Sequence, residues 1–184
     1  MAKPNEEKLI TLVDSAKKGD EGAFSELYEY YITSIFRFVY FRVRSRADAE
    51  DLTQGIFLKV WNSLSNYKHK KNSFSSWLYA VARNTVIDFW KKKKDWNISE
   101  LAKETIKDKT RPMDELLDDE QDLEKIKELM ELLTDEQQEA IVLKFIDDLS
   151  NKEISKILDK NEDATRQLQS RAIKTLREHI KKDI

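Results

Sequence analysis

Residues 48–61 read Asp-Ala-Glu-Asp-Leu-Thr-Gln-Gly-Ile-Phe-Leu-Lys-Val-Trp, and the fold can be worked out from this stretch. From this stretch into the residues just after it, apolar residues recur three and four positions apart, at Leu52, Ile56, Phe57, Val60, Trp61 and Leu64. On an α-helix this spacing gathers the side chains into one stripe, which other helices must cover. We therefore predict a helix here, and Asp48 can cap its N-terminus.

The segments on either side repeat this helical spacing. The preceding segment carries it at Phe24, Leu27, Tyr28, Tyr31, Ile35, Phe38 and Val39. The following segment, which Ser73 precedes as a start signal, carries it at Phe74, Trp77, Leu78, Val81, Thr85 and Phe89. With a shorter helix near residues 9–16, the first half predicts a four-helix bundle that ends near residue 94.

A second helical unit follows a break in the pattern. Between about residues 95 and 119 the apolar spacing is lost and acidic residues cluster, which predicts a linker. Helical spacing then returns, and Thr134 with Gln137 and Ser150 with Glu153 match the capping-box pattern. A short helix, a polar turn over 159–163 and a longer last helix give the outline of a helix-turn-helix. We predict an all-α protein with domains at 1–95 and 121–184, joined by an acidic linker at 96–120.

Composition excludes several functional classes. The 184 residues include no cysteine and only three glycines, so neither a disulfide framework nor a glycine-rich phosphate loop is expected. The two histidines lie far apart and show no metal-ligand spacing. We therefore expect no catalysis, cofactor or metal. The sequence has no apolar run that could cross a membrane and no signal-peptide pattern, so we expect a soluble cytoplasmic protein without membrane insertion.

Charge is distributed unevenly along the chain, although the net charge is only −2. Residues 1–95 hold 17 basic and 12 acidic residues, whereas residues 96–122 hold 4 and 9. This asymmetry suggests segments with separate roles, although charged runs often form solvated surfaces.

The last helix carries polar and basic side chains away from its apolar stripe: Arg166, Gln167, Ser170, Arg171 and Lys174. Arginine and glutamine near a helix N-terminus can reach base edges in the major groove. Lys174, Arg177, Lys181 and Lys182 suit phosphate groups. The alternative interpretation is an ordinary solvated helix face.

A second candidate nucleic-acid site lies between residues 66 and 96, where basic and aromatic residues alternate. Exposed aromatics stack on unpaired bases while cations follow the backbone. The polar candidates are Asn66, Tyr67, Lys68, His69, Arg83, Asn84 and Asp88. The competing interpretation is packing, to which we assign Phe74, Trp77, Leu78 and Phe89.

Three segments, taken in order, resemble extracytoplasmic-function sigma factors of bacterial RNA polymerase. Residues 48–61 resemble the polymerase-binding helix of that family. Residues 74–89, Phe-Ser-Ser-Trp-Leu-Tyr-Ala-Val-Ala-Arg-Asn-Thr-Val-Ile-Asp-Phe, resemble its promoter-melting helix. Residues 133–145, 153–158 and 172–177 are similar to its helix-turn-helix domain.

The resemblance implies partners and roles for the candidate residues. It implies that the first domain binds the largest subunit of core RNA polymerase through Asp51, Gln54, Phe57 and Leu58. It implies that the loop at 66–71 captures a flipped base of the −10 element, with Asn84 and Asp88 near the duplex junction. It further implies that the last helix reads the −35 element while its domain contacts the second-largest subunit, and that an anti-sigma factor binds the protein.

The sequence departs from the family pattern at Gly55, Asp159, Asp163 and Thr165, where the family commonly has Glu, Gly, Gly and Val. We expect Gly55 to weaken its helix slightly. Aspartate tolerates a left-handed backbone, so we expect the turn to persist.

Two other functions share part of this evidence. A stand-alone helix-turn-helix repressor or activator would use the last helix, usually as a dimer on a palindrome, but leaves 48–61 unexplained. A helical adaptor that binds another protein and no DNA is the second alternative.

Overall fold

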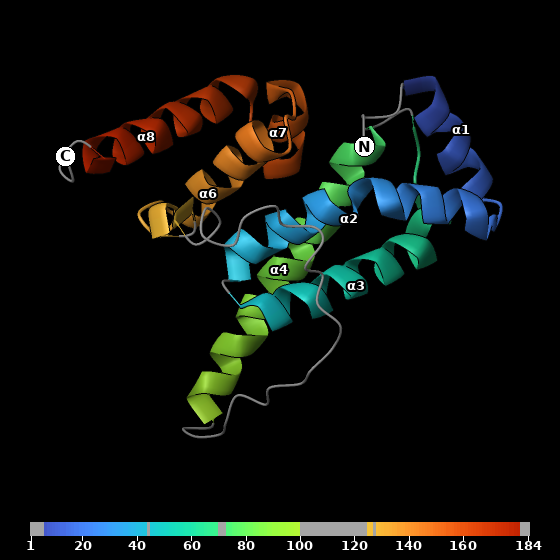
Figure 1. The fold of residues 1–184 in the computed structure, drawn as a ribbon, viewed down its shortest axis with the longest axis horizontal. Coiled ribbons are helices and arrows are strands. Elements are labelled where there is room, and N and C mark those ends of the chain that lie inside the picture. Colours follow the sequence, from blue (N-terminus) through green and yellow to red (C-terminus); the bar gives the residue numbers. More distant parts are fainter. Residues whose placement is uncertain (1–5, 44, 70–72, 100–124, 127, 181–184) are drawn as a thin grey trace.

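The computed structural model describes residues 6–43, 45–69, 73–99, 125–126 and 128–180, and their regular elements are helices (Figure 1). The first domain contains α1 (Glu6–Ala16), α2 (Glu21–Val43), α3 (Arg46–Ser63), the short 3₁₀ turn η1 (Leu64–Asn66) and α4 (Phe74–Ser99). Helix α2 packs against α1, α3 and α4, so the predicted four-helix bundle is confirmed. Helix α4 runs past the expected end near residue 94.

The second domain contains α6 (Asp135–Ile141), the π-helical turn η3 (Val142–Ile146), α7 (Asn151–Leu158) and α8 (Glu162–Ile180). Both predicted capping boxes form, at Thr134 and at Ser150. Asp159 ends α7 with a left-handed φ of 54°, as expected for an aspartate in the turn. Most of the predicted linker lies outside the described residues.

Two predictions about helix starts were wrong. Ser45, not Asp48, caps α3: its hydroxyl accepts the backbone N–H of Asp48 at 3.3 Å. Asp48 therefore lies in the first turn, where its charge favours the helix dipole. Asp163 lies in the first turn of α8, not in the preceding turn, and Asn161 accepts the backbone N–H of Ala164 at 2.7 Å.

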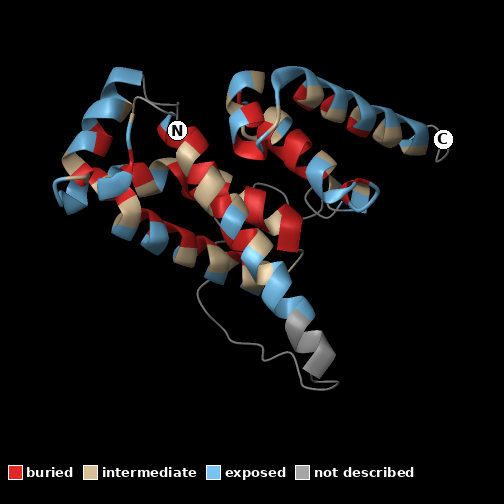
Figure 2. Ribbon diagram, turned by 180° about the vertical axis from the view of Figure 1, so that it is seen from behind, coloured by how far each residue is buried: buried red, intermediate tan, exposed pale blue. Residues whose placement is uncertain are grey.

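The two domains pack against each other, which the sequence did not predict. Helix α4 contacts α7, and α2 contacts both α6 and η3. Buried residues of both domains belong to one hydrophobic cluster, and Figure 2 marks buried residues in both domains. Gln54 and Arg171, one in each domain, nevertheless remain exposed. The faces that carry the candidate site residues are therefore largely outside the interdomain contact.

Candidate functional site

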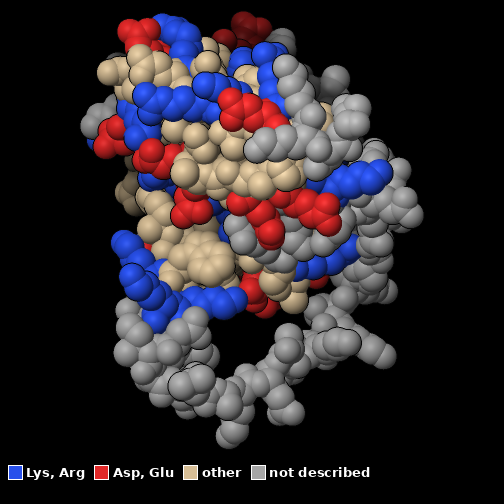
Figure 3. Space-filling model, turned by 90° about the vertical axis from the view of Figure 1, so that its left-hand side faces the viewer, with Lys and Arg blue, Asp and Glu red and all other residues tan. Residues whose placement is uncertain are grey.

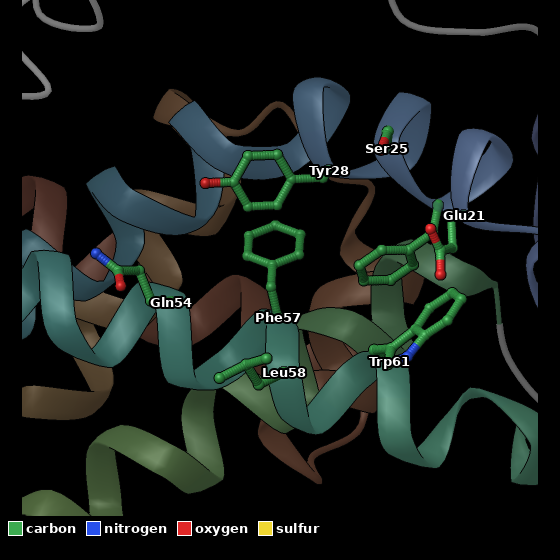
Figure 4. A pocket seen from close by; sticks show the side chains of 8 residues that line it. Glu21, Ser25, Tyr28, Gln54, Phe57, Leu58 and Trp61 are labelled. Atoms are coloured by element: carbon green, nitrogen blue, oxygen red, sulfur yellow. The ribbon is translucent and has the colours of Figure 1, made fainter.

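An apolar groove lies between α2 and α3 (Figure 4). Figure 4 shows Tyr28 and Phe57 pointing toward each other, and their ring centroids lie 4.7 Å apart. The Phe24 and Trp61 rings lie 4.7 Å apart in the same groove. The lining residues are Glu21, Phe24, Ser25, Tyr28, Gln54, Phe57, Leu58 and Trp61. Aromatic rings form the floor, and polar side chains border it.

The structure brings three of the four predicted polymerase-binding residues to this groove. Phe57 is buried in the floor, whereas Gln54 is exposed at the border. Leu58 is 64 % exposed, which is unusual for a leucine and leaves its side chain available to a partner. Asp51 is exposed on the same helix but does not line the groove. An added Cβ at Gly55 would meet no atom within 4 Å, so packing does not require glycine there.

The candidate base-capture loop follows η1. Asn66 and Lys68 are exposed, whereas the Tyr67 side chain is only 3 % exposed. Burial raises the pKa of Tyr67 to about 12. Tyr67 is therefore a packing residue in this structure. His69 is half-buried and pairs with Asp14 at 2.9 Å.

On α4, the predicted residues divide into two groups. Asn84 and Asp88 are exposed, and their i, i+4 spacing puts them on one face of the helix. Arg83 is half-buried, and its Nε donates to Glu139 Oε2 in the second domain at 3.1 Å. Arg83 is thus paired with protein while the domains are in contact.

On α8, all five predicted base-reading residues are exposed: Arg166, Gln167, Ser170, Arg171 and Lys174. Asp163 accepts a hydrogen bond from Arg166 at 2.6 Å and, with the nearby Glu162, raises the pKa of the guanidinium. Figure 3 shows acidic and basic side chains mixed over the upper half of the face where α6 to α8 lie. This domain therefore presents a surface of mixed charge, not a purely basic one.

Two buried polar contacts involve α8: one joins it to α7, and the other lies within its own N-terminal turn. Gln169 is 7 % exposed and donates to Asn151 Oδ1 at 3.0 Å. Thr165, which departs from the family pattern, is fully buried and its hydroxyl donates to the Asn161 carbonyl at 3.0 Å. The orientation of the exposed face is therefore determined by the opposite, buried face of the same helix.

Sequence reasoning missed a buried ion pair that joins the domains. Arg42 of α2 bonds Glu139 of α6, and the two side chains are 5 % and 2 % exposed. Arg83 completes the cluster by donating to the second oxygen of Glu139. No local pattern could have indicated this pairing, because Arg42 and Glu139 lie 97 positions apart.

Within the described ranges, no three His, Cys, Asp or Glu side chains form a group that could hold a metal ion. No helix in this part of the chain is both long enough and apolar enough to cross a membrane.

Comparisons with known proteins match both halves of the chain. The Sigma-70 region 2 family matches residues 27–95, and the Sigma-70 region 4 family matches residues 123–176. The ECF RNA polymerase sigma factor BldN of Streptomyces coelicolor is 31 % identical over 92 % of this chain, which corresponds to 64 % of BldN. The ECF RNA polymerase sigma factor SigX of Bacillus subtilis is 27 % identical over 87 % of this chain and 84 % of SigX.

Solved structures share the fold. CnrH, in complex with the cytosolic domain of CnrY, matches with a TM-score of 0.75 and 19 % identity over 96 % of this chain and 99 % of CnrH. The sigma factor RpoE of Bartonella quintana, in complex with the anti-sigma factor NepR, matches with a TM-score of 0.67 and 22 % identity over 88 % of this chain and 98 % of RpoE.

Proposed function

This chain belongs to the extracytoplasmic-function sigma factors of RNA polymerase, and on that basis we propose how its parts direct promoter-specific transcription initiation. We assign polymerase binding and −10 recognition to residues 1–95, and −35 recognition to residues 121–184. The chain supplies recognition, and the polymerase supplies the chemistry. Because polymerase and chromosome are its targets, it acts in the cytoplasm and is not itself an enzyme.

The groove between α2 and α3 binds the largest polymerase subunit. The exposed Leu58 enters an apolar site on the partner, while Gln54 and Asp51 make polar contacts at its edge. Such an arrangement, an apolar centre bordered by polar groups, is typical of the energetically dominant part of a protein interface. Phe57 is buried in the floor of the groove and maintains its shape by packing.

The first domain also captures the −10 element after the strands separate. Asn66 and Lys68 are exposed and can contact an unstacked base and its phosphate, while Asn84 and Asp88 lie at the edge of the remaining duplex. Flipping a base costs a few kcal/mol, which a preformed site must offset. Tyr67 and His69 support the loop, and Arg83 joins the DNA contacts once it leaves Glu139.

The second domain places α8 in the major groove of the −35 element. Arg166, Gln167, Ser170 and Arg171 face base edges, and Lys174 faces a phosphate. The same domain binds the second-largest polymerase subunit. Because few cations face this site, its affinity without polymerase should be low and strongly dependent on salt.

The two domains must separate before the chain can bind the −35 and −10 elements together. Elements centred at −35 and −10 lie about 25 base pairs apart, or about 85 Å at about 3.4 Å per base pair. A compact chain of this length has a radius of gyration of about 16 Å, so it is only about 40 Å across. Binding both elements therefore requires the interdomain contact, including the bonds of Arg42 and Arg83 to Glu139, to break.

An anti-sigma factor is the proposed inhibitory partner. RpoE was solved with the anti-sigma factor NepR, and CnrH with the cytosolic domain of CnrY. We extend this kind of partner to the present chain, where a protein that favours the contact between the domains would keep both DNA faces from acting together.

The observation that carries the proposal is the presence of two exposed sets of polar and basic side chains on different domains, with an apolar groove on one of them. The test is in vitro transcription on a fragmented genomic library with core polymerase and the purified chain, followed by mapping of start sites. We expect new start sites that share upstream elements. If core polymerase neither binds the chain nor changes its start sites, the proposal is wrong.

A further inference from the structure

The loop from Asn66 to His69 is tied to α1, an element to which no DNA or polymerase contact is assigned above. Lys17, directly after α1, donates from Nζ to the Tyr67 carbonyl at 2.8 Å. Asp14, in the last turn of α1, pairs through Oδ1 with His69 Nε2 at 2.9 Å. These contacts join residues 50 and 55 positions apart, so both are tertiary contacts.

The other side of the loop is fixed by packing. The Tyr67 ring lies 5.1 Å from the Trp77 ring, 5.8 Å from Phe74 and 4.9 Å from His69, measured between centroids. Its side chain is almost completely buried. The backbone of Tyr67 is therefore held by the packing of its own ring and by the hydrogen bond from Lys17 Nζ to its carbonyl.

The two residues that flank this fixed point are the exposed ones. Asn66 and Lys68 are adjacent to Tyr67, and neighbouring Cα atoms are only about 3.8 Å apart. Holding the Tyr67 carbonyl thus limits the positions that both side chains can reach. A site arranged in advance loses less conformational freedom when it binds.

The tie between Asp14 and His69 should contribute little to fold stability. The Asp14 and His69 side chains are 52 % and 29 % exposed, and ion pairs with this exposure add little to folding. Helix α1 is already attached to α2 through buried residues such as Val13 and Ala16. Losing Lys17 or Asp14 should therefore leave the domain folded.

We propose that Lys17 and Asp14 are positioning residues for capture of the −10 base, because they hold the loop at 66–69 in the form that accepts an unstacked base. This inference rests on the proposed function of the loop. It assigns to α1 a part in promoter opening that does not require α1 to touch DNA.

The test compares Lys17→Met with Lys18→Met in the full chain bound to core polymerase. Lys18 is the next residue and is exposed, so its substitution removes the same charge from the same surface. The probe is a single-stranded oligonucleotide of the non-template −10 sequence from a promoter mapped as above, labelled with 2-aminopurine. We expect Lys17→Met to weaken binding of this strand and to slow promoter opening by five- to tenfold. Lys18→Met should match the wild type.

Three further measurements separate positioning from a structural role. Melting temperature, affinity for core polymerase and binding of a −35 duplex should not change in Lys17→Met. Lys17→Arg, which keeps a donor, should restore most of the opening rate. Asp14→Asn should give a smaller loss, about two- to threefold, because its pair with His69 is the more exposed tie.

Each other outcome has a distinct meaning. Wild-type strand binding and opening by Lys17→Met would refute the inference alone. A parallel loss of melting temperature and core affinity would also refute it, because Lys17 would then have a structural role. Failure of the wild-type chain to bind core polymerase would refute the proposed function, and the inference with it.

Discussion

Glu139→Gln is the most informative single change, because it removes one charge from the ion cluster that joins the domains. The substitution keeps the shape of the side chain and one acceptor oxygen. Arg42 would remain between the domains without its counter-charge, in a position where its side chain is only 5 % exposed. Arg83 would lose the same partner.

The expected magnitude follows from this burial. Removing one partner of a buried pair usually costs about 3–5 kcal/mol, and the remaining acceptor favours the lower end. Because separation of the domains returns Arg42 to water, this cost acts on the contact between the domains and not on either bundle. About 3 kcal/mol would raise the ratio of separated to packed molecules by about 100-fold. Apparent affinity for core polymerase should rise with the fraction of separated molecules.

The assay is energy transfer between dyes placed on the two domains. The chain has no cysteine, so Asn62→Cys on α3 and Glu178→Cys on α8 give unique attachment sites, and both positions are exposed. Glu139→Gln should lower the transfer efficiency, while circular dichroism shows that the helices persist. The matched control is Glu136→Gln on the same helix, whose pair with Lys160 at 3.0 Å lies within the second domain and is half exposed. That control should change stability by less than about 1 kcal/mol and leave the transfer unchanged. Equal transfer in Glu139→Gln and the wild type would refute the reasoning.

Other changes test the groove and the core. Leu58→Asp should weaken core binding by at least about 30-fold, a loss of about 2 kcal/mol, without lowering the melting temperature, because Leu58 is 64 % exposed; wild-type affinity in a titration with labelled core polymerase would contradict the assignment of the groove. Gly55→Ala should stabilise the chain by about 0.5–1 kcal/mol in urea denaturation, since space is open for a Cβ and alanine favours the helix; a destabilised variant would be inconsistent with this geometry. Burial raises the pKa values of Tyr31 and Tyr67 to about 12, above the unfolded value of about 10. The folded state therefore favours the protonated phenols and loses stability when they must ionise. Stability should therefore be constant below pH 10 with respect to these groups and fall between pH 10 and 12, by about 1.4 kcal/mol per pH unit for each; ultraviolet titration that shows both phenols ionising near pH 10 in folded protein would disprove it.

The sequence predicted local structure well, because local structure depends on neighbouring residues. The apolar spacing around Ile56 and the capping residues Thr134 and Ser150 determine helices without help from distant parts of the chain. The start of α3 was misplaced because Ser45 and Asp48 are both good capping residues, and only the backbone geometry decides between them.

Contacts between distant residues were beyond the reach of sequence patterns. Tyr67 was expected at the surface because its neighbours are polar, but rings from α4 cover it. The pairing of Arg42 with Glu139 gives no periodic signal at all. The exposed candidates on α8 were easier to identify, since side chains off an apolar stripe face solvent in any packing of that helix.

Tethered cleavage of promoter DNA tests the central claim most directly. An iron chelate attached to Ser65→Cys, beside the loop, or to Asp163→Cys, at the start of α8, would cut DNA near each position in a complex with core polymerase. Both residues are exposed and neither is assigned a DNA contact. We predict cleavage at the −10 element from the first position and at the −35 element from the second, about 25 base pairs apart. Cleavage at one shared place, or cleavage that does not require core polymerase, would contradict the division of promoter recognition between two separated domains.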